Sequence, residues 1–360
     1  FVNKFQGLGR EEGLDGYLSI SNHVNIAGVY EDLDQPIYIL QNAHIDISTR
    51  IGVEVNGIMG SRFFENHMIE IDFQKHRITL FPKTNRPKGL EKMQCLPLDI
   101  VNSRPYIAVA FRQDDAVIDG RVLIDMGNSD ALMLIPSKLN NFDIKPPFID
   151  DYIGQGFNGE IYGKRNRIRS LELGPFTMNY PLVAYPELSS LQHATFVSER
   201  IGSLGNELLR RFKVILDYPN KVIYLRKNKD FDRFYYLNMS GLEIIHDGIQ
   251  YEREEIPVVL QKDGGTEVRM GNSVQYRFVL RNMYKIATVR EGSPAAIAGL
   301  LPDDKVIRIN GRSASSFSLE SIHNLFKSEK GKEMRFRVMR GGNTVDFKFV
   351  LKDPLPFNVD

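Results

Sequence analysis

An acid stands at the end of a short apolar run near the middle of this 360-residue chain. Residues 122–128 read Val-Leu-Ile-Asp-Met-Gly-Asn, so Asp125 follows three apolar residues and Gly127 comes two positions later. This pattern predicts a buried strand that ends in a tight loop. A carboxyl group held there could take up or give away a proton in catalysis. The ordinary alternative for a single Asp-x-Gly is an aspartate that caps a turn.

The elements that would position Asp125 are duplicated. Residues 57–73 and 202–218 share the order Gly-x-x-Gly, a short helical turn, an apolar strand and Asp-aromatic, at an offset of 202 − 57 = 145. Upstream, three glycines of each copy match at offsets of 146 or 147: Gly9, Gly16 and Gly28 with Gly156, Gly163 and Gly174. We therefore expect two copies of one β-rich unit.

The repeat also predicts how the chain is divided. We expect a first lobe at residues 1–90 and a second at 91–228, joined by the proline-containing stretch 82–97. Short strand patterns such as 104–111 and 116–124, separated by turn residues, predict a mainly β fold with few helices.

The loop and the glycine turns carry a resemblance to a known family. Residues 123–127, Leu-Ile-Asp-Met-Gly, resemble the second-lobe catalytic loop of the pepsin/retropepsin-like aspartic peptidases. Residues 58–60 and 203–205 resemble the hydrophobic-hydrophobic-Gly turn that follows this loop. The resemblance implies two similar acid-protease-like β-barrel lobes, with Asp125 as the second-lobe catalytic aspartate and Gly127 at the loop turn. The whole chain resembles bacterial aspartyl-protease-like proteins with a C-terminal PDZ domain.

The family's chemistry explains a two-lobed layout. Two carboxyl groups held close together cannot both ionise cheaply, so they share a proton. The ionised group activates water, and the protonated one polarises the scissile carbonyl. Under the resemblance, the hairpins at residues 7–16 and 154–163 lie over the cleft, with Gly154, Gly156 and Gly159 as flap-like residues. These glycines suit ordinary tight hairpins equally well.

Two departures from the family pattern bear on activity. Met126 stands where the family has Thr or Ser, whose hydroxyl helps to lock the two loops together. The repeat offset puts the partner of Asp125 at about 125 − 147 = −22, before Phe1, so the first lobe is expected to be N-terminally incomplete. We expect an aspartic endopeptidase that acts on a peptide or protein substrate. The alternative is an inactive, peptidase-like protein that binds peptides without cutting them.

The pattern changes in the C-terminal third. Residues 292–300, Gly-Ser-Pro-Ala-Ala-Ile-Ala-Gly-Leu, resemble the most specific part of a bacterial PDZ domain, which we expect at residues 237–353. An insertion near 247–282 is expected to form an extra hairpin around Asp263-Gly264-Gly265. PDZ domains bind peptide C-termini by strand addition. The best match to the loop that holds the peptide carboxylate is the run Ser240, Gly241, Leu242 and Glu243. A PDZ fold used only for docking or packing is the alternative.

Composition and spacing exclude several other functions. The formal net charge of +1 gives no electrostatic case for nucleic acid. The single cysteine, Cys95, excludes a disulfide framework within the chain. The G-x-G-x-x-G run at 154–159 precedes strand-like sequence, which argues against a dinucleotide site. The seven histidines lack metal-motif spacing, so we expect no metal and no cofactor.

Two acids, Asp72 and Asp217, occupy equivalent positions of the repeat. They end apolar strands well after the glycine turns, so we expect turn or strand-end roles for them rather than a catalytic dyad. The residues contain no transmembrane run, and the chain begins at Phe1 rather than Met. We expect an exported protein of the periplasm or cell envelope, and the oligomeric state is left open.

Overall fold

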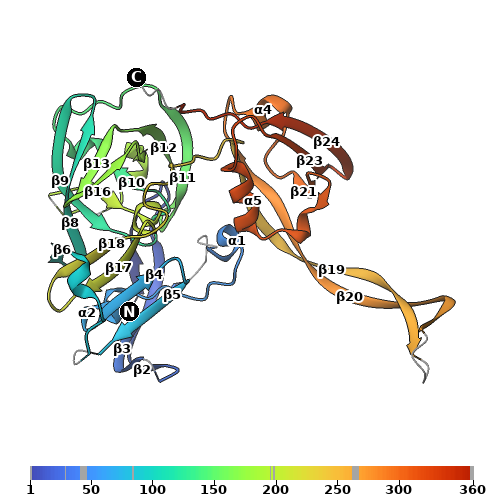
Figure 1. Cartoon of the computed structure of the whole chain (residues 1–360), viewed down its shortest axis with the longest axis horizontal. Coiled ribbons are helices and arrows are strands. Elements are labelled where there is room, and N and C mark those ends of the chain that lie inside the picture. The colour runs from blue at the N-terminus through green and yellow to red at the C-terminus, as the bar shows by residue number, and fades with distance from the viewer. Residues whose placement is uncertain are drawn as a thin grey trace. The chain divides into compact units, whose positions relative to one another are not determined.

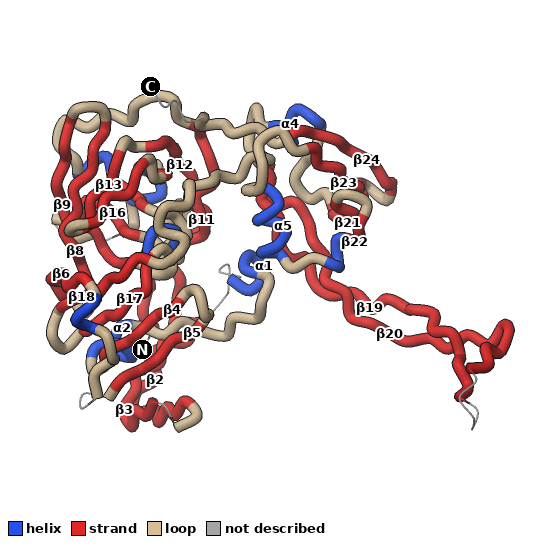
Figure 2. The backbone as a smooth tube through the Cα atoms, in the orientation of Figure 1, coloured by secondary structure: helices blue, strands red, loops and turns tan. Residues whose placement is uncertain are grey.

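The computed structural model describes residues 2–28, 30–40, 47–82, 85–194, 196–197, 199–261 and 267–356. Most of these residues lie in strands, which confirms the predicted mainly β fold (Figures 1 and 2). The chain forms two compact units. The first unit contains residues 1–45, 56–236 and 355–360, and the second contains 46–55 and 237–354. In the described ranges, none of the helices is long and apolar enough to cross a membrane.

The first unit is built from three sheets. The N-terminal part of the chain gives β1 (Val2–Phe5), β2 (Leu14–Ile26), β3 (Tyr30–Leu40), α2 (Ser61–Glu65), β4 (Met68–Asp72) and β5 (Arg77–Phe81). The following part gives η1 (Leu90–Lys92), β6 (Gln94–Pro97), β7 (Asp99–Val101), β8 (Arg104–Gln113), β9 (Ala116–Ile124), β10 (Leu132–Leu134), η2 (Pro136–Lys138), β11 (Ile149–Gly156), β12 (Gly159–Arg167), β13 (Ser170–Leu173), β14 (Phe176–Asn179), β15 (Leu182–Pro186), η3 (Leu188–Leu191), β16 (Arg200–Leu204), α3 (Asn206–Leu209), β17 (Phe212–Asp217) and β18 (Val222–Lys227). The sheet orders are β1-β2-β3, β11-β12-β15-β10-β16-β9-β8-β13-β14 with β7 beside β8, and β5-β4-β17-β18-β6.

The repeat is present in the structure with the same local elements and register. In the first copy Gly16 pairs with Leu40, and in the second Gly163 pairs with Pro186. The glycine turns also agree, because Gly60 precedes α2 and Gly205 precedes α3 with extended backbones. The predicted matches of Gly16 with Gly163 and of Gly60 with Gly205 are confirmed.

The two copies meet through a local twofold relation. Strands β4 and β17 run antiparallel, and Glu70 pairs with Ile215. Since 70 + 145 = 215, these are equivalent positions, and the remaining pairs of the ladder are arranged symmetrically about them. The Lys213 ammonium lies 2.8 Å from the Glu70 carboxylate, which keeps this nearly buried acid paired.

The in-phase acids end these strands as predicted. The Asp72 carboxylate accepts hydrogen bonds from the backbone N–H groups of Gln74 and Lys75, at 3.2 and 3.1 Å. The Asp217 carboxylate accepts from the backbone N–H of Asn220 at 3.2 Å. Both carboxylates therefore close hairpin turns and are not brought together as a catalytic pair.

The two copies differ in how much of each sheet is covered. In the second copy, β15 lies between β12 and β10, and β16 lies between β10 and β9. The described part of the first copy has no equivalents of β8, β9 and β10, and the counterpart of β16, residues 55–59, is irregular. Apolar side chains of β3 are consequently exposed where their counterparts in β15 are buried: Ile37 38%, Tyr38 53% and Ile39 53%, against Val183 0%, Ala184 0% and Tyr185 1%.

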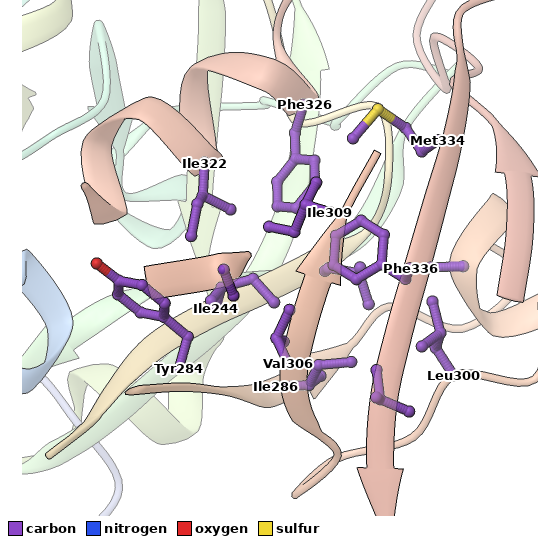
Figure 3. Packing of buried hydrophobic residues seen from close by; sticks show 14 of the residues in the cluster. Ile244, Tyr284, Ile286, Leu300, Val306, Ile309, Ile322, Phe326, Met334 and Phe336 are labelled. Atoms are coloured by element: carbon purple, nitrogen blue, oxygen red, sulfur yellow. The ribbon is translucent and has the colours of Figure 1, made fainter. Parts of the chain in front are cut away.

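The second unit is a sheet packed against one main helix. Its elements are α1 (Ile47–Ile51), β19 (Leu242–Gln261), β20 (Glu267–Val289), α4 (Pro294–Ala298), β21 (Lys305–Ile309), β22 (Arg312–Ser313), η4 (Ala314–Ser316), α5 (Leu319–Phe326), β23 (Glu333–Arg340) and β24 (Asn343–Val350). The strand order is β19-β20-β21-β23-β24, with β22 beside β21. Ile322 and Phe326 of α5 pack with Ile244, Ile309 and Phe336 of the sheet (Figure 3).

The predicted insertion forms the long arm of the second unit. Strands β19 and β20 pair from Ile249 with Asn282 out to Gln261 with Glu267. Asp263-Gly264-Gly265, predicted at the turn of this hairpin, lies outside the described residues. Arm residues Tyr251 and Phe278 are 72% and 69% exposed, so these apolar side chains of the hairpin face solvent.

The predicted domain boundaries stay predictions, although one buried arginine bears on where the first unit ends. Arg211 is 2% exposed, and its guanidinium donates to the backbone carbonyls of Asp230 and Phe231 at 3.3 and 3.2 Å. These bonds hold the segment after β18 on the first unit, which continues to Tyr236.

The equivalent glycines Gly60 and Gly205 differ in how closely the surrounding backbone approaches them. A Cβ at Gly205 would lie 2.2 Å from the Asp130 carbonyl oxygen, whereas a Cβ at Gly60 meets nothing described within 4 Å. We expect Gly205→Ala to lower the free energy of unfolding by about 1–3 kcal/mol through overpacking. Gly60→Ala is expected to change it by less than about 0.5 kcal/mol. Urea unfolding measures both, and equal losses would contradict the description.

Candidate functional site

The Asp125 loop begins where β9 ends. Strand β9 runs parallel to β16, with Ile124 beside Leu204, and the Asp125 backbone N–H donates to the Leu204 carbonyl at 3.0 Å. The Asp125 side chain is half-buried, and one of its carboxylate oxygens accepts the Gly127 N–H at 3.0 Å. Both predicted residues thus lie in one turn, with the carboxylate fixed by a backbone donor.

The second glycine turn supports this loop directly. The Asn206 N–H donates to the Asn128 carbonyl at 2.7 Å, and the Gly205 N–H donates to the Ala131 carbonyl at 3.1 Å. Gly205 is required because the Asn128 and Asp130 carbonyl oxygens approach its α-carbon too closely for any side chain. The two motifs that are separated by about 80 residues in sequence therefore form one structure.

An ion-pair cluster ties the same loop to the β11–β12 hairpin. The buried guanidinium of Arg165 pairs with Asp130 of the loop and, at 3.0 Å, with Asp151 of β11. Burial by itself would lower the pKa of Arg165, but the two carboxylates outweigh it and raise that pKa. The cluster stays charged and orients the loop and the hairpin together.

A cleft of about 830 Å³ opens over Asp125. Its lining comes from both copies of the repeat: Gln6, Gly7, Leu8 and Ile58 from the first, and Tyr106, Leu123, Asp125, Ile153, Gly154, Gly156, Phe157 and Arg200 among those from the second. Among the described residues that line the cleft, Asp125 is the one acidic side chain. The second carboxylate that an aspartic peptidase needs is not brought there by the described residues.

The two glycine-rich hairpins meet at the rim of this cleft. Asn158, at the tip of the β11–β12 hairpin, is fully buried, and its backbone N–H donates to the Leu8 carbonyl at 2.9 Å. Its side-chain oxygen accepts the Gly7 N–H at 2.5 Å, and its carbonyl accepts the Glu11 N–H at 2.7 Å. Residues 7–11 therefore clamp the hairpin tip.

The predicted flap-like glycines all lie on this hairpin. Gly154 and Gly156 belong to β11 and line the cleft, and Gly159 begins β12 with a positive φ of 90°. A Cβ at Gly156 would lie 2.0 Å from the Leu8 carbonyl oxygen, so this glycine is what allows the clamp to close. Their flap role remains a prediction.

Sequence reasoning missed two polar groups in the cleft wall. Arg200 is 6% exposed, and its guanidinium donates to the Gly202 carbonyl at 3.0 Å and to the Ser203 hydroxyl at 2.6 Å. Burial lowers the pKa of Arg200, and the nearby Tyr106 and Asp125 oppose that shift. The buried Tyr106 hydroxyl has no hydrogen-bond partner in the described parts of the chain. An arginine in an otherwise apolar strand was the available sequence signal.

The residues predicted to form the carboxylate-binding loop, 240–243, lie at the start of β19, and their role remains a prediction. Several amides of this loop already have acceptors, because the Asn238 side-chain oxygen accepts the N–H groups of Ser240 and Gly241 at 3.0 and 3.2 Å. The Leu242 N–H donates to the Ser240 hydroxyl at 3.0 Å, and Glu243 pairs with Thr288 of β20. A peptide carboxylate would have to replace Asn238 at these donors.

A PDZ domain binds a peptide as an added strand along the strand that follows this loop, which here is β19, beside helix α5. Strand β19 is at the edge of its sheet, and the Met239 N–H donates to the Phe326 carbonyl at the end of α5, at 3.0 Å. One turn earlier, His323 Nε2 lies 3.1 Å from the Ile244 carbonyl oxygen. Burial lowers the pKa of His323 below 6.5, although this hydrogen bond opposes the shift.

Comparisons with known proteins identify one domain. A family model of the PDZ domain matches residues 262–351, so the chain carries a PDZ domain, and the loop at residues 240–243 precedes the matched part. No curated protein sequence matches the chain.

Solved structures give weaker similarities. A retropepsin-like aspartic protease from Rickettsia conorii is 17% identical with a TM-score of 0.26, covering 37% of this chain and 89% of its own. The HtrA-type protease AlgW with decapeptide is 12% identical with a TM-score of 0.22, covering 94% and 93%. A serine endoprotease from Yersinia pestis is 12% identical with a TM-score of 0.21, covering 85% and 84%. These TM-scores are too low to establish a shared fold.

The Arg165 cluster predicts a large loss of stability on substitution. Arg165→Met leaves the Asp130 and Asp151 carboxylates close together without their cation, so we expect a loss of about 3–5 kcal/mol in the free energy of unfolding. The exposed pair of Arg169 and Asp115, 3.8 Å apart, supplies the control, and Arg169→Met should change stability by less than about 1 kcal/mol. Urea unfolding at pH 7 measures both. Equal losses in the two variants would contradict the cluster as a source of stability.

His323 predicts a loss of stability in acid. Its pKa is lowered by folding, so its contribution is fully present above the ordinary value of 6.5 and is lost as pH falls through the lower pKa of the folded state. His323→Gln keeps a donor for the Ile244 carbonyl but does not titrate. We expect the urea midpoint of the native chain to fall more between pH 7 and pH 5 than that of the variant. If the urea midpoints of the native chain and the variant fall equally with pH, the prediction is wrong, because His323 would then have the same pKa in the folded and unfolded states.

Proposed function

We propose that this protein is a peptidase in which the first unit hydrolyses peptide bonds by an aspartic mechanism and the PDZ domain binds peptides. The observation that carries the proposal is the place of Asp125. It lies on a braced loop beneath a cleft lined by both copies of a twofold repeat. We also propose that the protein is exported to the periplasm or cell envelope.

The mechanism needs two carboxyl groups with different protonation states. In the proposed reaction the ionised group takes a proton from water, and the protonated group donates to the scissile carbonyl oxygen. Asp125 supplies one of them, and the hydrogen bond from the Gly127 N–H fixes the direction of its carboxylate. The described residues that line the cleft do not supply the other, which in the proposed reaction is carried by a loop equivalent to that of Asp125.

We infer a substrate preference from two polar groups in the cleft wall. Arg200 can only donate hydrogen bonds, and the orphaned Tyr106 hydroxyl is free to donate one. Two donors, one of them cationic, match an acceptor of negative charge. The proposed substrate therefore carries an acidic residue near the bond that is cut.

A non-catalytic peptide-binding role is the second candidate. It is favoured by the absence of a second acidic side chain among the described residues that line the cleft. Met126, half-buried in place of a hydroxyl-bearing residue, points the same way, because it cannot donate a hydrogen bond to a partner loop.

Peptide cleavage separates the two candidates. A mixed peptide library is incubated with residues 1–360 and with the product of the full native gene, at pH 4 and pH 7. We expect cleavage by the native product that falls on the order of 10⁴-fold in Asp125→Asn, as loss of one member of a catalytic set does. Asp119→Asn, an exposed position on the same strand β9, is the control and should cleave normally.

The outcomes are distinct. Cleavage that survives Asp125→Asn would remove this residue from the mechanism. Binding of the library without cleavage by the native product would favour the second candidate. Arg200→Leu should weaken the preference for acidic peptides at least tenfold while neutral peptides are still cut.

A further inference from the structure

Residues 47–55 belong by sequence to the first copy of the repeat, yet they pack in the second unit. We propose that this segment, here called the plug, occupies the mouth of the peptide groove of the PDZ domain and has to leave before a peptide can bind. The proposal concerns the groove alone and does not depend on peptide cleavage.

The groove has a defined direction. The end of α5 meets the start of β19 where the Met239 N–H donates to the Phe326 carbonyl. His323, one turn earlier in α5, reaches the Ile244 carbonyl, which is farther along β19. Helix α5 therefore runs antiparallel to β19, and Leu319, its first residue, marks the end of the groove that is distant from the predicted carboxylate loop.

The plug lies at this distant end. Helix α1 packs on β19, beside α5 (Figure 1). Gly52, which follows α1 with a positive φ of 78°, sits so close to α5 that a Cβ there would lie 2.7 Å from the Leu319 Cβ. The upstream residues of a peptide added along β19 would have to pass through this space.

The plug is folded on itself. The Gly52 N–H donates to the Ser48 carbonyl at 2.7 Å, and the Val55 N–H donates to the Ser48 hydroxyl at 2.9 Å. A helical turn uses its backbone groups internally, so it covers β19 without extending the sheet. Ile51 and Val53 remain 53% and 60% exposed, so the plug buries little apolar surface.

These features make the plug a competitor that can be displaced. An added strand would gain a regular ladder of backbone hydrogen bonds along β19, which a helical turn cannot form. The plug compensates by being tethered, because an intramolecular ligand acts at a high effective concentration. His323 also competes with a bound peptide, because its side chain already occupies the Ile244 carbonyl, to which an added strand would otherwise bond. Ile58, in the wall of the Asp125 cleft, follows the plug by three residues, so release of the plug would free the chain next to the cleft.

The experiment measures peptide affinity with the plug in place and removed. The probe is a pool of fluorescent random decapeptides with a free C-terminal carboxylate and an apolar last residue, followed by anisotropy in the Asp125→Asn background so that none is cut. Replacing residues 47–53 by a Gly/Ser stretch of equal length should raise affinity about tenfold or more. Gly52→Ala should raise it severalfold, because the strained φ and the contact with Leu319 loosen the plug.

Gly57→Ala is the matched control, because a Cβ there meets no described atom within 4 Å. It should leave the affinity unchanged. Hydrogen exchange supplies a second readout: in the native chain the pool should accelerate exchange at residues 48–55 and slow it at 242–246. Unchanged or weaker binding after plug replacement would overturn the proposal. So would a pool that binds neither form, or bound peptide that leaves exchange in the plug unaltered.

Discussion

The pairing of β4 with β17 is the constraint on which the first unit depends. The ladder centred on Glu70 and Ile215 joins equivalent strands of the two copies, so each copy is placed by the other. The hairpin tips then meet on the far side, where Asn158 is enclosed by residues 7–11. A cleft lined by both copies follows from these two contacts, and Asp125 lies at its base.

The Asp125 loop gains its order from partners that are distant in sequence. Backbone bonds from Asn206 and Gly205 hold one side of the loop, and Arg165 holds the other through Asp130. In the family that the sequence resembles, a hydroxyl at the position of Met126 helps to join two loops. Here the loop is held by contacts within its own copy, so its shape does not require a partner loop. The proposed chemistry still requires a second carboxyl group.

The sequence predicts those features that repeat or that are local. The in-phase glycines located both hairpins and both turns, because close backbone approach at Gly156 and Gly205 leaves no room for a side chain. The acids at 72 and 217 were assigned to turns correctly, since an aspartate binds nearby backbone N–H groups.

Features that depend on long-range packing could not be predicted. Nothing local to Arg165 indicates that Asp130 and Asp151 will surround it, and Arg200 carries no motif. The packing of residues 47–55 in the second unit was missed because it depends on Gly52 fitting against Leu319, which is distant in sequence. The exposure of apolar side chains along β3 was not predicted either, because it depends on which strands cover that sheet.

The most direct test of the account is the binding of a transition-state mimic. A library peptide is compared with its analogue in which a secondary alcohol replaces the scissile amide, by calorimetry with the product of the full native gene. The account predicts that the analogue binds at least about 10²-fold more tightly and that Asp125→Asn abolishes this difference while leaving affinity for the parent peptide. Equal affinities for the two peptides, or a difference that persists in Asp125→Asn, would contradict a catalytic role for the Asp125 cleft.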